Sequence, residues 1–328
     1  MTTKPNDVGV LLTNLGTPDA PEPSAVRRYL AEFLSDPRVV EIAPAIWKPV
    51  LHGVVLRTRP AKSARAYREI WTNEGSPLMA ISKRQTEALR LRFGDALCVG
   101  LAMRYGDASI GYALSKMVDH GFKRILVAPL YPQYCAATTA STIDAVSAEL
   151  KAMRSQPAIR TLPPYFEDPL YIDALKASIA RQMEALEFKP ERLLLSFHGM
   201  PERTRTLGDP YYGQCRATAA LLEQQFELPI DVAFQSRFGR ARWLQPATEV
   251  VLASYPTQGV RRVAIAAPGF TADCLETLEE LGIRGRDTFI GAGGTHFARL
   301  DCLNDSDEGM AMLDALIRRE LAGWWPSS

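Results

Sequence analysis

The chain has 328 residues, of which 47% are hydrophobic, so it can bury two cores of ordinary size. Its 38 basic and 37 acidic residues give a formal net charge of +1, which argues against a nucleic-acid binder driven by bulk charge. No apolar stretch approaches the roughly 20 residues that span a bilayer, and Met1–Asp7 lacks the apolar core of a signal peptide. The five cysteines include no C-x-x-C pair, so we expect reduced thiols in a cytoplasmic enzyme, without a disulfide framework or zinc ribbon.

Strand-like apolar runs alternate with amphipathic helical segments along the whole chain. Short, nearly continuous apolar runs separated by helices predict parallel sheets covered on both faces. The expected strands, in chain order, are Val8–Leu15, Ala96–Met103, Arg124–Leu130, Ala158–Leu162, Arg192–Phe197, Asp231–Gln235, Arg262–Ala267 and Thr288–Ile290. The expected helices between them include Ile110–Asp119, Thr139–Met153, Tyr171–Leu186, Ala217–Phe226 and Pro246–Tyr255.

Two internal sequence repeats, called echoes below, indicate a duplication. Leu11–Pro18 aligns without gaps on Leu194–Pro201, and Gly121–Ile125 aligns on Gly259–Val263 in the same order. We therefore predict an α/β fold of two similar doubly wound, Rossmann-like parallel-sheet halves, with the active-site cleft between them.

The two halves are expected to differ in length. We place the N-terminal half at residues 1–168 and the C-terminal half at 169–328, and leave open whether the C-terminal helix packs back on the first half. Between matching positions the first half spans 113 residues and the second spans 69, so the first carries 44 extra residues, placed near 37–79. This insertion contains an apolar stretch, up to Leu56, that is followed by Arg57 and Arg59. It is either extra core packing, or a lip over the cleft for a large apolar ligand with negative groups, or a membrane-touching patch.

His198 stands where an apolar run ends at a glycine, Gly199. The carboxyl ends of strands are where open parallel sheets bind ligands, and an imidazole exchanges protons near neutral pH and binds metals. The first echo sets Leu15 at the matching position of the other half. A cleft between the halves should therefore have one apolar wall and one titratable wall.

An acidic segment follows Phe270, and Gly282 is the expected end of its helix. Asp273, Glu276 and Glu280 are spaced i, i+3, i+7 and are expected to share one face. Helix capping alone explains such carboxylates. The other interpretation is a column of carboxylates that, with an imidazole, binds a divalent cation or relays protons. The sequence has no dinucleotide fingerprint, P-loop, nucleophile elbow or zincin motif.

Nine short blocks occur in a fixed order between about Val8 and Arg319. They are Leu15–Pro18, Gly75–Leu78, Met103–Tyr105, Tyr131–Tyr134, Ser196–Gly199, Gly208–Tyr211, Gln235–Arg237, Trp243–Pro246 and Asp273–Leu278. Together they resemble the ferrochelatase family. The resemblance implies a lyase that inserts Fe²⁺ into protoporphyrin IX and releases two protons to form protohaem, the last step of haem biosynthesis.

The resemblance also implies roles for individual residues. It makes His198 and Glu276 the catalytic and metal-binding pair, and Asp273 and Glu280 a path for protons or metal. It favours protoporphyrin over coproporphyrin, because Leu15 is apolar where coproporphyrin-specific relatives often have tyrosine. The positions that resemble the family's porphyrin pocket are Leu15, Arg59, Tyr67, Arg104, Tyr105, Tyr131, Ser236, Trp243 and Phe270.

Some expectations depart from the family or stay open. Cys274 stands where many relatives have histidine, so a metal role there is in doubt. The ending Gly323–Ser328 has no cysteine group, so no [2Fe–2S] cluster and no other tightly bound cofactor are expected. Peripheral contact with the inner membrane through the apolar lip stays open, and no nucleic-acid partner is expected. The alternatives are a cobalt or nickel chelatase for another tetrapyrrole, a coproporphyrin ferrochelatase, and a non-catalytic porphyrin carrier.

Overall fold

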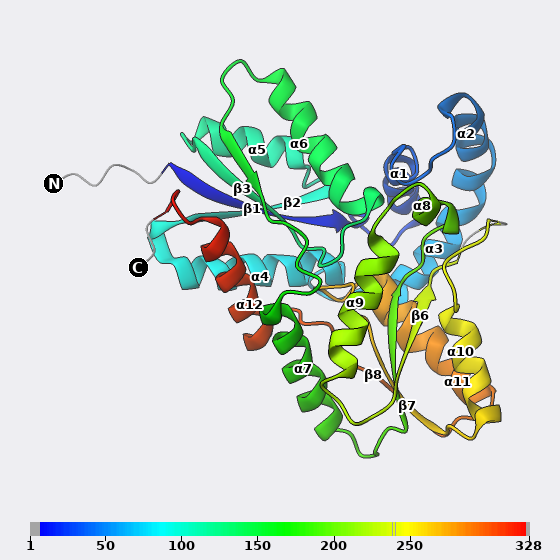
Figure 1. Cartoon of the computed structure of the whole chain (residues 1–328). Coiled ribbons are helices and arrows are strands. Elements are labelled where there is room, and N and C mark those ends of the chain that lie inside the picture. The colour runs from blue at the N-terminus through cyan, green and yellow to red at the C-terminus, as the bar shows by residue number, and fades with distance from the viewer. Residues whose placement is uncertain (1–6, 238, 240, 326–328) are drawn as a thin grey trace. The chain divides into compact units, whose positions relative to one another are not determined.

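The computed structural model describes residues 7–237, 239 and 241–325, which form two compact units (Figure 1). Unit 1 comprises described residues up to 131, then 136–163 and 310–325. Unit 2 comprises 132–135 and the described part of 164–309. The expectations about a signal peptide and a terminal cysteine group fall partly on residues 1–6 and 326–328, which lie outside the described residues.

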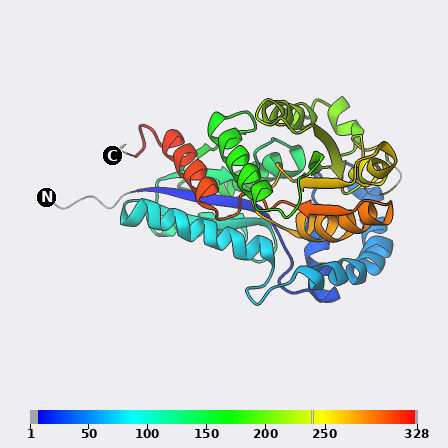
Figure 2. The same cartoon turned by 90° about the horizontal axis from the view of Figure 1, so that it is seen from below.

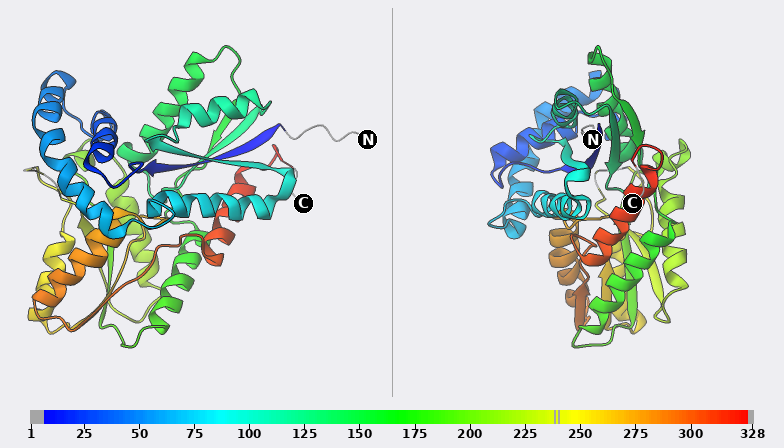
Figure 3. Two further views of the ribbon diagram at one scale, coloured as in Figure 1. Left: turned by 180° about the vertical axis from the view of Figure 1, so that it is seen from behind. Right: turned by 90° about the vertical axis from the view of Figure 1, so that its left-hand side faces the viewer.

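Unit 1 contains a four-stranded, all-parallel sheet in the order β2-β1-β3-β4. Its strands are β1 (Val8–Gly16), β2 (Cys98–Tyr105), β3 (Arg124–Pro129) and β4 (Ala158–Thr161). Helices cover both faces, as the apolar strands require (Figures 2 and 3). They are α4 (Pro77–Phe93), η2 (Gly94–Ala96), α5 (Ile110–Asp119), η3 (Ala136–Ala140), α6 (Ser141–Ala152) and most of α12 (Asp307–Glu320).

Unit 2 repeats this design with the sheet order β6-β5-β7-β8. Its strands are β5 (Arg192–His198), β6 (Ile230–Gln235), β7 (Arg262–Ala266) and β8 (His296–Arg299). Its helices are α7 (Pro169–Glu184), α8 (Glu202–Thr206), α9 (Tyr211–Glu223), α10 (Thr248–Ser254), η4 (Tyr255–Gln258), η5 (Glu276–Gly285) and α11 (Arg286–Gly291).

The strand registers confirm the two similar halves. Leu12 of β1 lies opposite Ala128 of β3, and its echo partner Leu195 in β5 lies opposite Ala266 of β7. In each sheet the first strand is central, the second strand pairs on one side, and the third pairs on the other. The order of strands therefore reverses at β1 and at β5, which places the ligand-binding end of each sheet at the carboxyl end of its central strand.

Segment 37–79 is helical and lies within unit 1. One face forms a small core in which Leu51, Val55 and Leu56 are buried with Leu34. Its outer residues are exposed, and Ile46 keeps 66% of its surface. The segment therefore combines core packing with an exposed apolar surface. Its helices are α2 (Pro44–Val50), the π-helix η1 (Leu51–Val55) and α3 (Leu56–Ile70), with α1 (Pro23–Phe33) before them.

Two predictions near the acidic helix were wrong. Gly282 does not end the helix, which continues through η5 and α11, so Thr288–Ile290 is helical and the edge strand β8 comes later. The apolar run Thr288–Ile290 resembles a strand in composition, but Phe289 is buried in the helix-covered core of unit 2. Gly282 instead allows a close approach, because a Cβ there would lie 3.0 Å from Cδ of Arg299.

Candidate active site

The site in unit 2 begins where β5 and β6 end side by side. His198 is the last residue of β5 and lies opposite Gln235, the last residue of β6. The next amide, from Gly199, donates a 2.7 Å hydrogen bond to the carbonyl oxygen of Gln235. A Cβ at Gly199 would lie 2.3 Å from that oxygen, so only glycine fits. The glycine after His198 therefore lets the two strand ends stay paired up to the imidazole.

Two of the predicted aromatic residues border His198, which is partly buried. The rings of His198 and Phe270 are edge-on, with centroids 6.3 Å apart. The backbone of Trp243 pairs with Pro201, and its Cε3 would lie 3.4 Å from a Cβ at Gly199. One aromatic ring thus borders the imidazole and a second lies beside the next residue, Gly199, which suits a large flat apolar ligand.

Gln235 connects the histidine strand to the acidic helix. Its Nε2 donates a 2.9 Å hydrogen bond to the backbone carbonyl of Glu276, the first residue of η5. Because Gln235 is also the backbone register partner of His198, one buried residue connects the end of the histidine strand to the backbone of Glu276. Sequence reasoning gave no role to this glutamine, although its position at a strand end beside His198 was a usable signal.

Asp273 anchors the loop before the helix. Its carboxylate accepts hydrogen bonds from Thr277 Oγ1 at 2.6 Å, Arg299 Nη1 at 2.9 Å and Asn304 Nδ2 at 2.7 Å. The amide of Cys302 donates a fourth, at 3.3 Å. Asp273 precedes the helix, so the prediction that helical spacing puts it on one face with Glu276 and Glu280 was wrong.

The acidic helix is a π-helix for ten residues, Glu276–Gly285. Its i→i+5 hydrogen bonds make each turn wider than an α-helical turn, and π-helical segments are frequent at functional sites. The carboxylate of Glu280 accepts hydrogen bonds from the amide of Ser236 at 2.7 Å and from its Oγ at 2.5 Å. Ser236 has a left-handed backbone with φ +65°, which is unfavourable for a serine and is held by this double contact.

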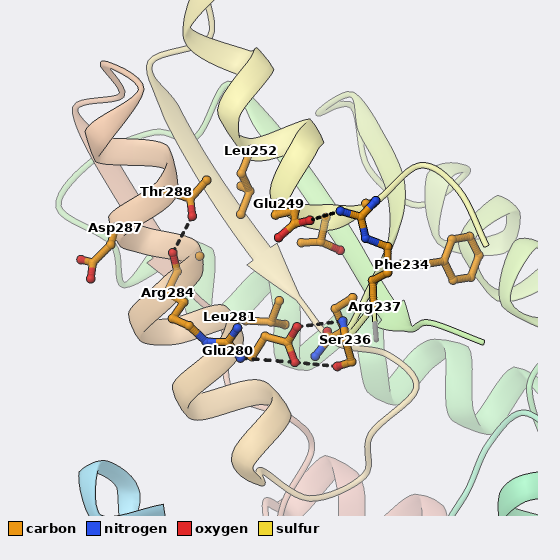
Figure 4. Close-up of a pocket in the computed structure, with 14 residues that line it drawn as sticks. Phe234, Ser236, Arg237, Glu249, Leu252, Glu280, Leu281, Arg284, Asp287 and Thr288 are labelled. Carbon is orange, nitrogen blue, oxygen red and sulfur yellow. Dashed lines mark hydrogen bonds and ion pairs between the residues drawn. The ribbon is translucent and has the colours of Figure 1, made fainter. Parts of the chain in front are cut away.

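A cavity of about 340 Å³ lies beside Ser236, between β6, α10 and the acidic helix (Figure 4). Its charged residues are paired, Arg237 with Glu249 at 3.1 Å and Arg284 with Glu280 at 3.7 Å. Burial tends to lower the pKa of Arg284, but its hydrogen bonds to Glu279 and the nearby carboxylates raise it overall. The paired charges make this cavity unlike the apolar pocket that a porphyrin requires, and His198 is not among its lining residues.

Unit 1 holds a second buried network at the matching strand end. Arg104 lies opposite Leu15, because the neighbouring residues of β1 and β2 pair in register. Asp36 Oδ2 accepts hydrogen bonds from Arg104 Nη2 at 2.6 Å, Tyr105 Oη at 2.8 Å and Ser141 Oγ at 2.6 Å. Burial tends to raise the pKa of Asp36, but these donors and the Arg104 charge lower it overall. Sequence reasoning missed Asp36.

The remaining predicted pocket residues of unit 1 differ in exposure. Tyr105 is 1% exposed, so it acts within the Asp36 network rather than on a surface. Tyr67 is also buried and packs edge-on against Trp71, with centroids 6.1 Å apart. Leu15, Tyr131 and Arg59 are partly exposed, and burial lowers the pKa of Arg59.

Cys274 is buried between Asp273 and the helix. Burial raises its thiol pKa well above the usual value, and the charge of Glu276 adds to that shift. Within the described ranges, no group of three or more His, Cys, Asp or Glu side chains could hold a metal ion.

Two doubly wound parallel units, with a histidine and an acidic helix at the strand ends of one, define a protein with the fold of the metal chelatases. SirB from Bacillus subtilis with Fe³⁺ has the same fold, with a TM-score of 0.59, 12% identity and 96% of each chain covered. The sirohydrochlorin chelatase SirB from Bacillus subtilis subspecies spizizenii, in complex with cobalt, gives a TM-score of 0.53 at 12% identity, over 74% of this chain and 90% of that one.

Sequence comparison identifies the family. The ferrochelatase family model matches residues 7–321. Ferrochelatase of Methylibium petroleiphilum is 51% identical over 96% of this chain and 88% of its own length. Ferrochelatase 2 of Shewanella oneidensis is also 51% identical, over 95% of this chain and 97% of its own length. The chain belongs to the ferrochelatase family, which confirms the resemblance noted in the sequence.

Proposed function

We propose that this chain is a lyase that inserts Fe²⁺ into protoporphyrin IX and releases two protons to form protohaem. The observation that carries the proposal is the joint placement of His198 and Glu276 around Gln235, in a chain of this family. His198 is the last residue of strand β5, and Glu276 is the first residue of the helix η5. Such positions are fixed by the sheet and are therefore suited to catalysis.

The chemistry assigns one task to each side chain. A free-base porphyrin carries two inner N–H protons that must leave as iron enters. His198 accepts these protons, because an imidazole is the side chain most often used as a general base. Glu276 lies on the same strand-end assembly and offers a carboxylate oxygen to the partly dehydrated cation. A water-poor site strengthens both interactions, and binding of the large apolar rim stabilises a puckered macrocycle.

The porphyrin contacts form a second part of the proposal. In unit 2, Phe270 lies edge-on to the imidazole and Trp243 lies beside Gly199, and both aromatic rings suit the macrocycle face. In unit 1, Leu15 supplies an apolar contact that favours protoporphyrin, and the guanidinium of Arg59 supplies a partner for a propionate. Tyr67, Arg104, Tyr105 and Tyr131 support this wall, Tyr105 from within the Asp36 network.

The acidic path is a third part of the proposal. Glu280 follows Glu276 by four residues in the acidic helix. Its carboxylate is bound by Ser236, beside the charged cavity. In this proposal Glu280 passes protons or metal toward Glu276, and its position beside the cavity supports that role. Asp273 holds four donors, so it serves the path by fixing the start of the helix, and any transfer through it must displace one of them.

The cellular setting is also proposed. Among the described helices, none is long and apolar enough to cross a bilayer. The exposed side chains of Ile46, Val50 and Val54 on segment 37–79 support peripheral membrane contact of a cytoplasmic enzyme. Co-sedimentation with anionic vesicles tests this contact, and Ile46→Ser with Val54→Ser should weaken it. Equal sedimentation of the variant would contradict a contact through this segment.

The central experiment follows protoporphyrin fluorescence after ferrous iron is added to the anaerobic protein. Rapid loss of emission with formation of the protohaem spectrum is expected. A panel of cobalt and nickel with other tetrapyrroles, including coproporphyrin, tests the substrate choice. Tight porphyrin binding without turnover would instead indicate a carrier. We also propose that no [2Fe–2S] cluster is needed, so the active purified protein should lack iron–sulfur absorption bands.

A further inference from the structure

Gln235 is a buried amide with both of its ends in use. Only 3% of its surface is exposed. Its Oε1 accepts a 2.9 Å hydrogen bond from Ser196 Oγ, and its Nε2 donates the 2.9 Å bond to the carbonyl oxygen of Glu276. Its backbone oxygen accepts the 2.7 Å bond from Gly199. One residue thus contacts the strand of His198 through two groups and the helix of Glu276 through a third.

The hydroxyl of Ser196 fixes the orientation of this amide. Because Ser196 gives its proton to Gln235, the 2.8 Å contact with Thr248 Oγ1 requires Thr248 to donate. The chain of donors then runs from Thr248 through Ser196 and Gln235 to Glu276. Such chains polarise each bond in turn, so the amide has one favoured orientation, with its N–H group toward the helix.

The bond to Glu276 acts on the first turn of the π-helix. A donor from outside the helix competes for a carbonyl of the first turn, and such an insertion is a recognised cause of altered helix geometry. The next residue, Ser236, binds the carboxylate of Glu280 one step further on. The end of β6 therefore contacts the acidic helix at two positions, Glu276 and Glu280. The contact at Glu276 uses only the backbone, so it takes up none of the oxygen atoms of its carboxylate.

We propose that Gln235 is a positioning residue that sets the carboxylate of Glu276 relative to the imidazole of His198. The inference rests on the proposed function of that pair. Gln235 touches neither iron nor porphyrin in this account, and acts by fixing the backbone from which Glu276 projects. Replacement of Gln235 should therefore weaken the binding of the metal ion more than the binding of porphyrin.

The test uses Gln235→Leu, which keeps a similar volume and removes both side-chain hydrogen bonds. Partners that orient a metal ligand typically contribute about 10- to 100-fold to metal affinity or activity. We expect the KM for iron and the Kd for Co²⁺ alone, measured by calorimetry on the porphyrin-free protein, to rise by about that factor. The KM for porphyrin should be unchanged. Gln235→Asn, a milder change in case the leucine variant does not fold, should shift the same two constants in the same direction.

Gln133→Leu is the matched control. Gln133 is an equally buried glutamine of unit 2, 2% exposed, and donates a 3.0 Å bond to Thr218. This variant should lose stability and keep the wild-type Kd for Co²⁺. An equal rise of that Kd in the control, or no rise in either Gln235 variant, would overturn the inference. A wild-type protein that inserts no iron would instead refute the proposed function, so the two failures are distinguishable.

Discussion

Units 1 and 2 have the same sheet order and register, yet only one of them carries titratable chemistry at the end of its central strand. Leu15 is the next-to-last residue of β1 in unit 1, at the position that matches His198, the last residue of β5 in unit 2. The topology fixes where a side chain is presented, and the residue type decides what that position does. The duplicated scaffold therefore provides two equivalent positions, one occupied by an apolar side chain and the other by an imidazole, to which we assign the uptake of protons in the proposed function.

Each unit also contains one buried aspartate paired with an arginine. The side chains of Asp36 and Asp273 are both 5% exposed, and those of Arg104 and Arg299 are 19% and 18% exposed. Asp36 fixes the chain just before segment 37–79, whereas Asp273 fixes the loop just before the acidic helix. The same kind of Asp–Arg pair thus supports a surface segment in one unit and the acidic helix that carries Glu276 in the other.

The largest expected effect separates the two strand ends. His198→Ala should lower kcat for iron insertion by about 10²- to 10⁴-fold, the usual contribution of a general base, while porphyrin binding stays measurable. The matched change Leu15→Ala should leave kcat near wild type and raise the KM for porphyrin. Steady-state fluorescence assays measure both constants. Robust turnover by His198→Ala would remove the proposed difference between the units.

Glu276→Gln should have a smaller but still large effect. The amide keeps the shape and loses the charge that attracts the cation, so we expect about a 10- to 100-fold loss of kcat/KM for iron. The measurement is activity against iron concentration at saturating porphyrin. An unchanged iron profile would reduce Glu276 to a residue that only begins a helix.

The buried pairs Asp36–Arg104 and Asp273–Arg299, the two anchors, test whether a loss of stability can occur without a loss of activity. Asp273→Asn and Asp36→Asn should each lower the free energy of unfolding by about 3 kcal/mol, because each leaves a largely buried arginine without its carboxylate. Urea titration measures this loss. Only Asp273→Asn should also raise the KM for iron, because its loop carries the helix of Glu276. If both variants shift that constant equally, the anchors do not have separate tasks.

Acid sensitivity sharpens the account of Asp36. Its folded-state pKa is lowered, so its contribution to stability is complete above the unfolded carboxyl pKa of about 3.9 and is lost as the pH falls through the folded value. The free energy of unfolding of the wild type should therefore fall more steeply below about pH 4 than that of Asp36→Asn. Urea titrations at several pH values give both slopes, and parallel slopes would argue against the anchor.

The smallest effect concerns a glycine in the acidic helix. Gly282→Ala presses on Cδ of Arg299, so overpacking should exceed the gain in helix propensity and leave a net loss of about 1 kcal/mol. The control is Gly291→Ala at the end of the same helix, where a Cβ meets nothing within 4 Å. The control should stabilise the protein slightly. A stabilised Gly282→Ala would show that Arg299 moves aside without loss.

Repetition and periodicity made much of the fold predictable from sequence. The sequence match between Leu11–Pro18 and Leu194–Pro201 agrees with the observed strand registers. Both segments form the buried central strand of a sheet, so the same apolar pattern is needed in each. The strand end at His198 followed from a glycine after an apolar run. These signals are local, so a single sequence contains them.

The features that escaped prediction depend on tertiary contacts. The π-helix and its continuation past Gly282 depend on Gln235 and Arg299, which approach from other strands. Asp36 gave no sign of its role, because its partners Arg104 and Ser141 are distant in sequence. Spacing along one helix could not reveal that Asp273 belongs to the loop before it.

Unit 1 is discontinuous in sequence, and this has a consequence for synthesis on the ribosome. The last part of α12 returns to β4, where Arg160 Nη1 donates hydrogen bonds to the carbonyls of Glu320 at 2.8 Å and Ala322 at 2.9 Å. Arg318 and Trp325 pack on Phe93 of the same unit. Translation proceeds from the N-terminus, so unit 1 emerges first but lacks these contacts until residues 318–325 have been synthesised. The apolar side chains exposed on segment 37–79, such as Ile46, therefore belong to a domain that stays incomplete while unit 2 is translated.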